Sequence, residues 1–274
     1  GYHSDLGRII PMARQVNFLL DPVLEEELVN ARRSFQGLDR GTVLRVLRFS
    51  DFGRERIRNC WVSPDAFVQM AIQLAQFRVF GRCHMAYEAV MTRRFLFGRT
   101  EAMRPVSTQV LTFIRSMEEA ADREVRTVAF REACEEHVRR IGMCKQGLGV
   151  DRHLFGLLEI FRRYGESLDI KRCPAIYLDR GWKVLKHNRI STSTTSSVGL
   201  VLAGYAPVVE DGFGVRYMTK PEAINFNVTA RGGHSGDLDR MVRELERALT
   251  DIMEMFVNQE IQGASSFSLW QEEA

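Results

Sequence analysis

The stretch Ile190-Ser-Thr-Ser-Thr-Thr-Ser-Ser-Val-Gly-Leu-Val-Leu-Ala-Gly-Tyr-Ala-Pro-Val-Val-Glu-Asp211 decides how the fold of this chain is interpreted. Small hydroxyl residues fill 191–197, the apolar run 198–202 follows them, and Gly204 and Pro207 then interrupt the pattern. Hydroxyl groups at the end of a strand can direct several O–H donors into one pocket, and an apolar strand beside them can form a wall of that pocket. Composition alone favours a Ser/Thr-rich edge strand or loop, so the rest of the chain must decide between the two interpretations.

The composition describes an ordinary soluble globular protein. The chain has 274 residues, which is long enough for one large domain or two small ones. Hydrophobic residues make up 45% and charged residues 27%, as is typical of such proteins. The formal net charge of +3 is too small to indicate a nucleic-acid partner. No apolar run approaches the roughly 18 residues that a membrane-spanning helix needs.

Five cysteines stand at irregular spacing, without a CxxC pair. This pattern predicts reduced thiols in an intracellular compartment rather than a disulfide or zinc framework. The chain begins at Gly1, without an initiator Met and without the apolar segment of a signal peptide. We therefore expect Gly1 to mark a cut and the chain to be a piece of a longer protein.

Hydrophobic periodicity predicts one α/β domain in which long helices cover a small sheet. The expected strands are 16–20, 43–49, 214–218 and 223–228. Helix-start signals, a capping residue followed by proline, stand at Asp21-Pro22 and at Ser63-Pro64. The expected helices run from Pro22 to near Gly37, from Pro64 onward, from about 117 to 144, from Asp151 onward with Leu154, Leu157, Leu158 and Phe161 facing inward, and over 238–256.

Four clusters of residues follow one another in a recognisable order. They are Arg54-x3-Arg58-x4-Ser63-Pro64-Asp65; Tyr87-Glu88 leading to Phe97-Gly98-Arg99-Thr100-Glu101; Gly149-Val150-Asp151-Arg152-His153-Leu154; and Ser191-Thr192-Ser193 with Pro207-Val208-Val209-x-Asp211-Gly212-Phe213-Gly214. In order and approximate spacing they resemble the C-terminal half of the carnitine/choline acyltransferase family, from about Arg14 to Phe256, and most of all the carnitine O-acyltransferases.

The resemblance implies a fold and a reaction. Family members have two similar domains, each a mixed α/β sheet flanked by long helices as in chloramphenicol acetyltransferase, with the active site in a tunnel between them. Residues 1–274 would form the single C-terminal domain, with 1–20 as a residual inter-domain segment and the protein's own N-terminal domain as partner. The implied reaction is the reversible transfer of a short- or medium-chain acyl group between coenzyme A and carnitine. Coenzyme A is a substrate there, and no metal or resident cofactor is implied.

Carnitine carries a carboxylate, a trimethylammonium group and the hydroxyl that accepts the acyl group. A planar guanidinium offers paired donors to a carboxylate. By resemblance Arg152 is the family's carnitine-carboxylate arginine, and the hydroxyls of Tyr87 and Thr100 complete that site. Without the resemblance, an ion pair from Arg152 to Asp151 or Glu159 on the same helix is the simpler interpretation. Choline enzymes carry other residues at the Thr100 and Arg152 positions, so the resemblance favours carnitine.

The hydroxyl stretch supplies further site residues by the same resemblance. Ser193 corresponds to the donor that stabilises the oxyanion of acyl transfer, and losing such a donor typically costs roughly a hundredfold in rate. Ser191 lies two residues away, on the same face of a strand, and Tyr205 matches an aromatic beside the ammonium group. Ala203 stands where carnitine acetyltransferases carry a methionine that closes the acyl pocket and where medium- and long-chain enzymes carry glycine. The alternatives are hydroxyls that satisfy one another and the main chain, and a tyrosine that fills the core or surface.

A coenzyme A site is implied nearer the N-terminus. Arg54 and Arg58 lie four residues apart and share a face if this segment is helical. They match positions where the family usually has lysines that hold phosphates, and Asp65 matches an acid of the same site. An acid at this position also favours a helix N-terminus without any ligand.

The general base that acyl transfer requires is not recognisable in the chain. The family uses a histidine followed by Asp-Gly a few residues on, and none of the six histidines has this pattern. His153 is expected to be a helix residue hydrogen-bonded within the fold. The base would lie upstream, in the other domain, so this chain alone is expected to be inactive. The alternative is a non-catalytic domain that binds acyl-coenzyme A or a partner protein. We expect an intracellular location, with the mitochondrion as one candidate.

Overall fold

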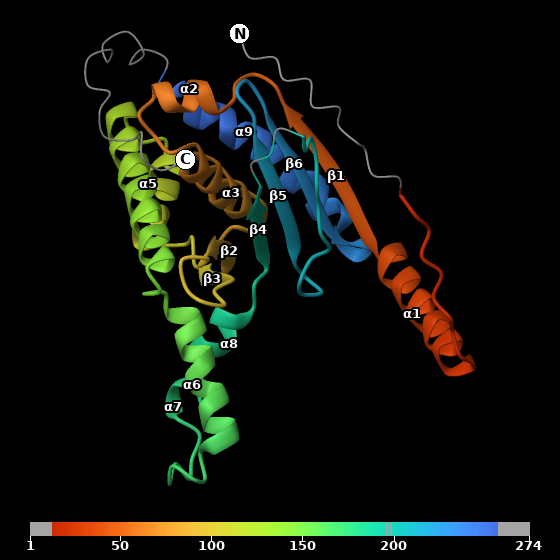
Figure 1. Ribbon diagram of the computed structural model, residues 1–274. Helices are drawn as coiled ribbons and strands as arrows, with labels where there is room; N and C mark the ends of the chain where they lie inside the picture. The colour runs from red at the N-terminus through yellow and green to blue at the C-terminus, as the bar shows by residue number, and fades with distance from the viewer. Residues whose placement is uncertain (1–12, 196, 198, 257–274) are drawn as a thin grey trace, which may run out of the picture. The chain divides into compact units, whose positions relative to one another are not determined.

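Figure 1 shows the computed structural model, which describes residues 13–195, 197 and 199–256. The chain divides into two compact units, Gly1–Gly41 and Thr42–Ala274. Among the helices in the described ranges, none combines the length and the apolar character needed to cross a bilayer.

Helix α1 (Pro22–Arg40) is the regular element of the first unit. It begins where the sequence predicts, because the carboxylate of Asp21 caps it and accepts the main-chain N–H of Leu24 at 2.9 Å. It continues beyond the predicted end near Gly37. The strand predicted at 16–20 is wrong, since these residues have no strand conformation. A strand needs a partner for its main-chain groups.

The second unit alternates strands and helices. Its strands are β1 (Thr42–Phe49), β2 (Ala86–Met91), β3 (Thr100–Met103), β4 (Ile190–Thr194), β5 (Phe213–Thr219) and β6 (Ile224–Arg231). Its helices are α2 (Arg54–Asn59), α3 (Pro64–Phe80), α4 (Thr108–Glu118), α5 (Arg123–Lys145), α6 (Val150–Tyr164), α7 (Ala175–Leu178), α8 (Arg180–Lys186) and α9 (Ser235–Glu254), with a 3₁₀ turn η1 (Gly232–His234) before α9.

The strands form one mixed sheet in the order β1-β6-β5-β4-β2-β3 (Figure 1). Strands β2, β4 and β5 run parallel, whereas β1 and β5 are antiparallel to β6 and β3 is antiparallel to β2. The connection from β3 to β4 carries α4 to α8, as the parallel β2–β4 pair requires a long crossover. The predicted mixed sheet flanked by long helices is confirmed, and three of the predicted strands correspond to β1, β5 and β6.

Helices α3, α5 and α9 supply most of the hydrophobic core against one face of the sheet. Helix α3 starts at the predicted cap Ser63, whose hydroxyl oxygen accepts the N–H of Ala66 at 3.4 Å. Of the side chains that the periodicity places in phase on α9, Met241, Leu245, Leu249 and Ile252 are buried, whereas Val242 is partly buried against the core. Each such side chain stabilises the fold by about 1.5–3 kcal/mol, so these helices fix the sheet from one side.

Two helix predictions need correction. Residues 117–144 do not form one helix, because α4 ends at Glu118 and Ala120 adopts a left-handed conformation with φ 50° before α5 begins. In α6, Leu158 is buried as predicted, but Leu157 is 44% exposed, because adjacent positions of a helix point in different directions. Periodicity also misses β2 and the shorter elements β3, α7 and α8.

Candidate functional site

Ser191 lies inside the sheet, in β4, between Tyr87 of β2 and Gly214 of β5. Side chains alternate along a strand, so Ser191 and Tyr87 point to one face and Thr192 points to the face covered by α3. There the Thr192 hydroxyl donates to the Tyr87 carbonyl at 2.8 Å and accepts from the Gln69 amide at 3.0 Å. The structure thus brings Ser191 and Tyr87 together on the face opposite α3.

Between β4 and β5 the described residues form a loop, so 199–202 are not the apolar strand that was one interpretation of this stretch. Residue 198 lies outside the described residues, and 199–207 belong to no strand. Three side chains donate to carbonyls of the loop, namely Lys220 to Leu200 at 2.6 Å, Asn225 to Val201 at 3.1 Å and Thr229 to Tyr205 at 2.6 Å. These donors satisfy main-chain groups that a strand ladder would otherwise satisfy, and they hold the loop against β5 and β6.

A hydrogen bond from Tyr205 connects this loop to β4. Its hydroxyl donates to the main-chain carbonyl of Ser191 at 2.6 Å, and burial raises the pKa of Tyr205 to about 12. The loop passes so close to β5 that a Cβ added to Gly214 would lie 2.6 Å from the Thr229 hydroxyl and 2.8 Å from the Tyr205 carbonyl. Glycine is therefore required at 214, and the predicted aromatic residue lies beside Ser191.

Ser193 is two residues beyond Ser191 on the same face of β4 and is partly buried. Its hydroxyl forms no hydrogen bond with any residue that the structure describes. It is therefore available as a donor to a bound group. Ala203 is also partly buried, but it lies in the loop, between the anchored carbonyls of Val201 and Tyr205.

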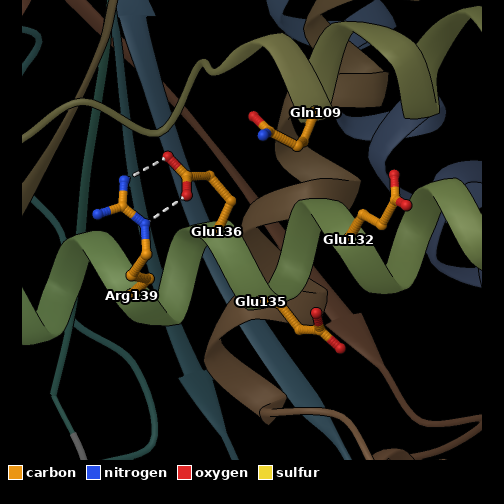
Figure 2. Close-up of a pocket in the computed structure, with 5 residues that line it drawn as sticks. All are labelled: Gln109, Glu132, Glu135, Glu136 and Arg139. Atoms are coloured by element: carbon orange, nitrogen blue, oxygen red, sulfur yellow. Dashed lines mark hydrogen bonds and ion pairs between the residues drawn. The ribbon is translucent and has the colours of Figure 1, made fainter.

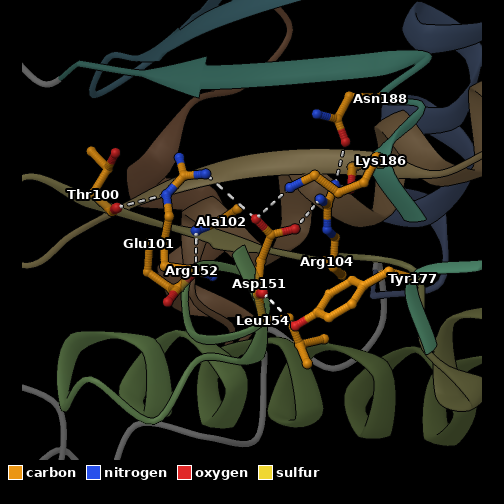
Figure 3. Close-up of polar contacts among 11 residues, drawn as sticks. Thr100, Glu101, Ala102, Arg104, Asp151, Arg152, Leu154, Tyr177, Lys186 and Asn188 are labelled. Carbon is orange, nitrogen blue, oxygen red and sulfur yellow. Dashed lines mark hydrogen bonds and ion pairs between the residues drawn. The ribbon is translucent and has the colours of Figure 1, made fainter. Parts of the chain in front are cut away.

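Arg152 and Thr100, two of the three residues predicted to bind the carboxylate, meet as Figure 3 shows. Arg152 is in the first turn of α6, and its Nε donates to the carbonyl of Thr100 at 3.3 Å. Its main-chain N–H donates to Oε1 of Glu101 at 3.1 Å. Glu101 is buried and also accepts the N–H of Ala102 at 2.7 Å. The Arg152 side chain nevertheless remains 45% exposed, so its outer face can receive a ligand.

Asp151 anchors the same helical turn from inside the protein (Figure 3). It is fully buried and forms a close ion pair with Arg104, which follows β3, and a second with Lys186 of α8 at 3.1 Å. Burial alone would raise the pKa of Asp151, but Arg104 and Lys186 outweigh it and hold the pKa below its usual value. The start of α6 is therefore fixed by charges from two other segments.

The simpler interpretation of Arg152, an ion pair with Asp151 or Glu159, is supported only in part. Arg152 lies 3.4 Å from Asp151, whose two other cationic partners are closer. Glu159, the other expected partner, pairs instead with Arg162 at 2.7 Å. Counting Glu101, three cationic side chains face two carboxylates in this network. The network therefore has one positive charge in excess, and the solvent-exposed cation among its members is Arg152.

The predicted coenzyme A residues lie on α2 and α3. Arg54 and Arg58 are one turn apart on α2, Arg58 exposed and Arg54 partly buried. Asp65 is in the first turn of α3, where its Oδ1 accepts the hydroxyl of Tyr217 at 2.5 Å. Within the described part of the chain no ion pair joins Asp65 to either arginine. The structure therefore does not assemble these three residues by direct contact.

Several residues that organise the site have no place among the sequence predictions. Glu101 is adjacent to Thr100, and an acid beside a binding residue at a strand start is a signal that could have found it. Arg104 and Lys186 give no local signal, because each comes from a segment without a motif and reaches Asp151 only in the folded chain.

A separate pocket of about 550 Å³ lies on the surface of α4 and α5 (Figure 2). It is lined by Gln109, Glu132, Glu135, Glu136 and Arg139 and includes none of the predicted site residues. The guanidinium groups of Arg139 and Arg140 hold the pKa of Glu136 at about 2. This lining is mainly acidic, so it does not suit the phosphates of coenzyme A.

The structure corrects the prediction for His153 and agrees with the prediction for the cysteines. His153 is exposed, and its ring forms no hydrogen bond with a described residue, so it is not held within the fold as expected. His137 is instead the histidine buried among other polar groups. His3 lies outside the described residues. None of the five cysteines, all of which the structure describes, is in a disulfide, in agreement with the sequence prediction.

Comparison with known proteins identifies the family. The sequence model described as "Choline/Carnitine o-acyltransferase" matches residues 4–247. The chain belongs to the choline/carnitine O-acyltransferase family. Its homologues are carnitine acyltransferases, which supports acyl transfer as the chemistry of the family.

Three relatives illustrate the similarity. The chain is 31% identical over 261 residues to a putative mitochondrial carnitine O-acetyltransferase of Saccharomyces cerevisiae, covering 94% of this chain and 37% of that protein. It is 29% identical over 251 residues to carnitine O-acetyltransferase of Rattus norvegicus, covering 91% and 39%. It is 32% identical over 245 residues to mitochondrial carnitine O-palmitoyltransferase 2 of Macaca fascicularis, covering 88% and 36%. The chain thus spans less than two fifths of the length of these relatives.

Among solved structures, a condensation domain for chain release from the enacyloxin polyketide synthase aligns with a TM-score of 0.45 and 12% identity, covering 91% of this chain and 49% of that one. A probable dihydrolipoamide acetyltransferase from Listeria monocytogenes aligns with a TM-score of 0.42 and 9% identity, covering 87% and 95%.

Proposed function

We propose that this chain supplies the carnitine-binding side of a carnitine O-acyltransferase, which moves a short- or medium-chain acyl group reversibly between coenzyme A and carnitine. The arrangement of Arg152 and Thr100 carries this proposal. The guanidinium is oriented by the Thr100 carbonyl at 3.3 Å and stays 45% exposed. It can therefore offer paired donors to the carboxylate of carnitine, and Thr100 is exposed beside it.

The charge around Arg152 supports an anionic ligand. Asp151 is neutralised by Arg104 and Lys186 before Arg152 is counted. Arg152 is also at the N-terminal end of α6, where the helix dipole favours negative charge. A carboxylate bound there completes the neutralisation of the network, whereas choline, a cation without a carboxylate, gains nothing from it.

The transfer itself requires a donor for the oxyanion and a base. In the proposed reaction the carnitine hydroxyl oxygen attacks the thioester carbonyl carbon, a C–O bond forms and the C–S bond breaks. A base outside this chain takes the hydroxyl proton and passes it to the sulfur, so coenzyme A leaves as the thiol. The free hydroxyl of Ser193 suits the oxyanion, Ser191 and Tyr87 border the substrate, and the ring of Tyr205 suits the ammonium group.

The remaining proposals concern coenzyme A and the protein around this chain. Arg54 and Arg58 suit phosphates, because a guanidinium binds them with several donors, and Asp65 completes that side. Coenzyme A acts as a substrate, and no resident cofactor is required. The base is proposed to come from the protein's own N-terminal domain. We also propose an intracellular, mitochondrial location, which the names of the yeast and macaque relatives support.

Thiol release from acetyl-coenzyme A by the intact natural protein tests the proposal. We expect Arg152→Asn to raise the KM for carnitine about ten- to hundredfold, since a hydrogen bond between charged groups contributes about 1.5–3 kcal/mol. Use of choline should be unchanged or improved. Arg162→Asn, which removes a surface ion pair of the same helix, is the matched control. An unchanged carnitine KM in Arg152→Asn would show that Arg152 serves only its own helix.

A chain of residues 1–274 alone is expected to bind substrates without turning them over, because no histidine in it fits the base. Turnover by this chain that is abolished by His153→Ala would contradict the proposal and make His153 the base. Binding of acyl-coenzyme A by an intact protein that transfers no acyl group would favour a non-catalytic domain.

A further inference from the structure

Three ionisable side chains meet on the core face of the sheet, namely Asp65 from α3, Glu88 from β2 and His137 from α5. Nε2 of His137 lies 3.3 Å from Oε2 of Glu88 and 3.7 Å from Oδ2 of Asp65. The side chains of His137 and Glu88 are 0% and 6% exposed, whereas that of Asp65 is 32% exposed. The cluster is therefore accessible to solvent mainly at Asp65, which is the acid proposed for the coenzyme A site.

The surroundings of the cluster contain few charges. Tyr217 of β5 donates to Asp65 at 2.5 Å and accepts from the amide of Gln69 of α3 at 3.1 Å. Cys144 of α5 is also near Glu88, and burial raises the pKa of its thiol to about 11. No lysine or arginine side chain pairs with either carboxylate in the described ranges.

Two carboxylates cannot both keep a charge so close together in a buried space. The ligand atoms of the three side chains all lie within 4.8 Å of one another. Burial and the nearby Asp65 raise the pKa of Glu88 well above its usual value. Burial alone would also raise the pKa of Asp65, but His137 and Tyr217 outweigh it and lower the pKa. The excess proton therefore belongs on Glu88, and the negative charge belongs on Asp65.

The hydrogen-bond inventory agrees with this assignment. Both ring nitrogens of His137 and Oε2 of Glu88 are buried without a hydrogen-bond partner among the described residues. Buried polar groups without partners are rare in folded proteins. A proton on Glu88 can satisfy Oε2 of Glu88 and Nε2 of His137 across their 3.3 Å contact.

We propose that Glu88, held as the neutral acid, and His137 are positioning residues that keep Asp65 ionised and fixed at the start of α3 for the coenzyme A site. The identity of the ligand rests on the proposed function, whereas the protonation of the cluster does not. Glu88 is also the neighbour of Tyr87 in β2. The cluster therefore joins the proposed coenzyme A side to the proposed carnitine side. Neither positioning residue touches a substrate, and both act through Asp65.

The proton on Glu88 makes the stability of the fold depend on pH in a distinct way. Because the pKa of Glu88 in the folded protein is above the usual value of 4.5, the folded protein keeps a proton that the unfolded chain releases. The contribution of this group to stability is complete below pH 4.5 and declines as the pH rises toward the folded-state pKa. In Glu88→Gln the amide imitates the neutral acid at every pH, so this decline is lost.

Difference infrared spectroscopy of the intact natural protein tests the protonation state directly. At neutral pH we expect the C=O stretch of a neutral carboxylic acid in the wild type and its loss in Glu88→Gln. Glu119→Gln, at an exposed position after α4, is the control and should leave the band in place. Absence of the band from the wild type would overturn the proposal, whether or not the protein is active.

Kinetics test the positioning role. Glu88→Ala should raise the KM for coenzyme A about tenfold or more, and Glu88→Gln should restore it to within about threefold of wild type. The carnitine KM should change less than the coenzyme A KM. Equal losses in both variants would overturn the proposal, because an ionised carboxylate would then be required. One firmly held divalent metal ion per chain, lost in Glu88→Gln, would overturn it in favour of a metal site. No turnover by the wild type would count against the proposed function, and the infrared band would still decide the state of Glu88.

Discussion

Glu101 and Arg152 are joined by a hydrogen bond from the main-chain N–H of Arg152 to Oε1 of Glu101, 3.1 Å long. Helix α6 has no capping side chain of its own, because its N-cap is Gly149. Glycine is required there, since an added Cβ would lie 2.3 Å from Cγ of Glu101. A carboxylate from β3 thus replaces the missing cap. The Glu101 side chain thus links the strand that carries Thr100 to the helix that carries Arg152, in addition to the bond from Nε of Arg152 to the Thr100 carbonyl.

Glu101→Leu should therefore weaken both the helix start and carnitine binding. Leucine leaves the main-chain N–H groups of Ala102 and Arg152 without this acceptor, and each unsatisfied buried donor costs about 1–3 kcal/mol. We expect a loss of about that size in urea unfolding and a rise of about tenfold in carnitine KM. Glu159→Gln, in an exposed ion pair of α6, is the control. Unaltered stability and KM would mean that the cap is dispensable.

In Asp151→Asn the free energy of unfolding should depend less on pH in the acid range. Arg104 and Lys186 lower the pKa of Asp151 in spite of burial, so its contribution is present above the unfolded value of 3.8 and is lost as the pH falls through the folded-state pKa. At pH 7 we expect the variant to be less stable by about 3 kcal/mol, as for other broken buried pairs. The difference in unfolding free energy between the variant and the wild type should become smaller in unfolding curves measured below about pH 4.

The control for Asp151→Asn is Asp169→Asn, which removes an exposed ion pair with Lys171 at 3.3 Å. Such surface pairs contribute about 0–1 kcal/mol, so little change is expected at any pH. A deficit in Asp151→Asn that stays constant into acid would show that the side chain acts through packing and not through its charge.

Tyr205→Phe should release the loop between β4 and β5 while leaving its aromatic ring in place. The variant loses the 2.6 Å hydrogen bond to the Ser191 carbonyl, which is worth about 0.5–1.5 kcal/mol. Hydrogen exchange of 199–207 should accelerate, and carnitine KM should change by less than about threefold. Tyr164→Phe, at the 56% exposed end of α6, is the matched control. Unchanged exchange in Tyr205→Phe would show that Asn225 and Thr229 hold the loop without it.

The elements that sequence predicts well are those with local signals. Ser63 and Pro64 start α3 because capping is a property of a few adjacent residues, and α9 shows its apolar face at helical spacing. The strand predicted at 16–20 fails for a different reason, as does a strand over the described part, 199–202, of the second apolar run. An apolar run becomes a strand only if another strand pairs with it. The second run is held instead by side chains that follow it in the chain, among them Asn225.

The site was predictable only where residues could be compared with a family. Arg152 and Thr100 gave no sign of proximity on their own, and only the resemblance placed them together. The ion pairs of Asp151 with Arg104 and Lys186 could not be found in this way, because charges from distant segments have no periodicity. The cluster around His137 was hidden for the same reason, since its members come from α3, β2 and α5.

Ala203 is placed so that the size of its side chain should act on the acyl pocket. The carbonyls two residues before and after it are fixed by Asn225 at 3.1 Å and Thr229 at 2.6 Å, so the loop cannot easily move aside. The family resemblance places Ala203 where a methionine closes the acetyl pocket. Tyr205 is held at Ser191, which leaves Leu202 as the neighbour that could fill the space instead.

We therefore expect the intact natural enzyme to use butyryl- to octanoyl-coenzyme A at least as well as acetyl-coenzyme A. Each methylene buried in the space left by alanine contributes about 0.8 kcal/mol, or about fourfold in kcat/KM. Ala203→Met should remove this gain, lowering kcat/KM for octanoyl-coenzyme A by about a hundredfold and for acetyl-coenzyme A by less than about threefold. The measurement is kcat/KM for the acetyl, butyryl, hexanoyl and octanoyl substrates, with Leu202→Ala as the comparison. A steep acetyl preference that Ala203→Met leaves unaltered, and that Leu202→Ala relaxes, would show that Leu202 closes the pocket.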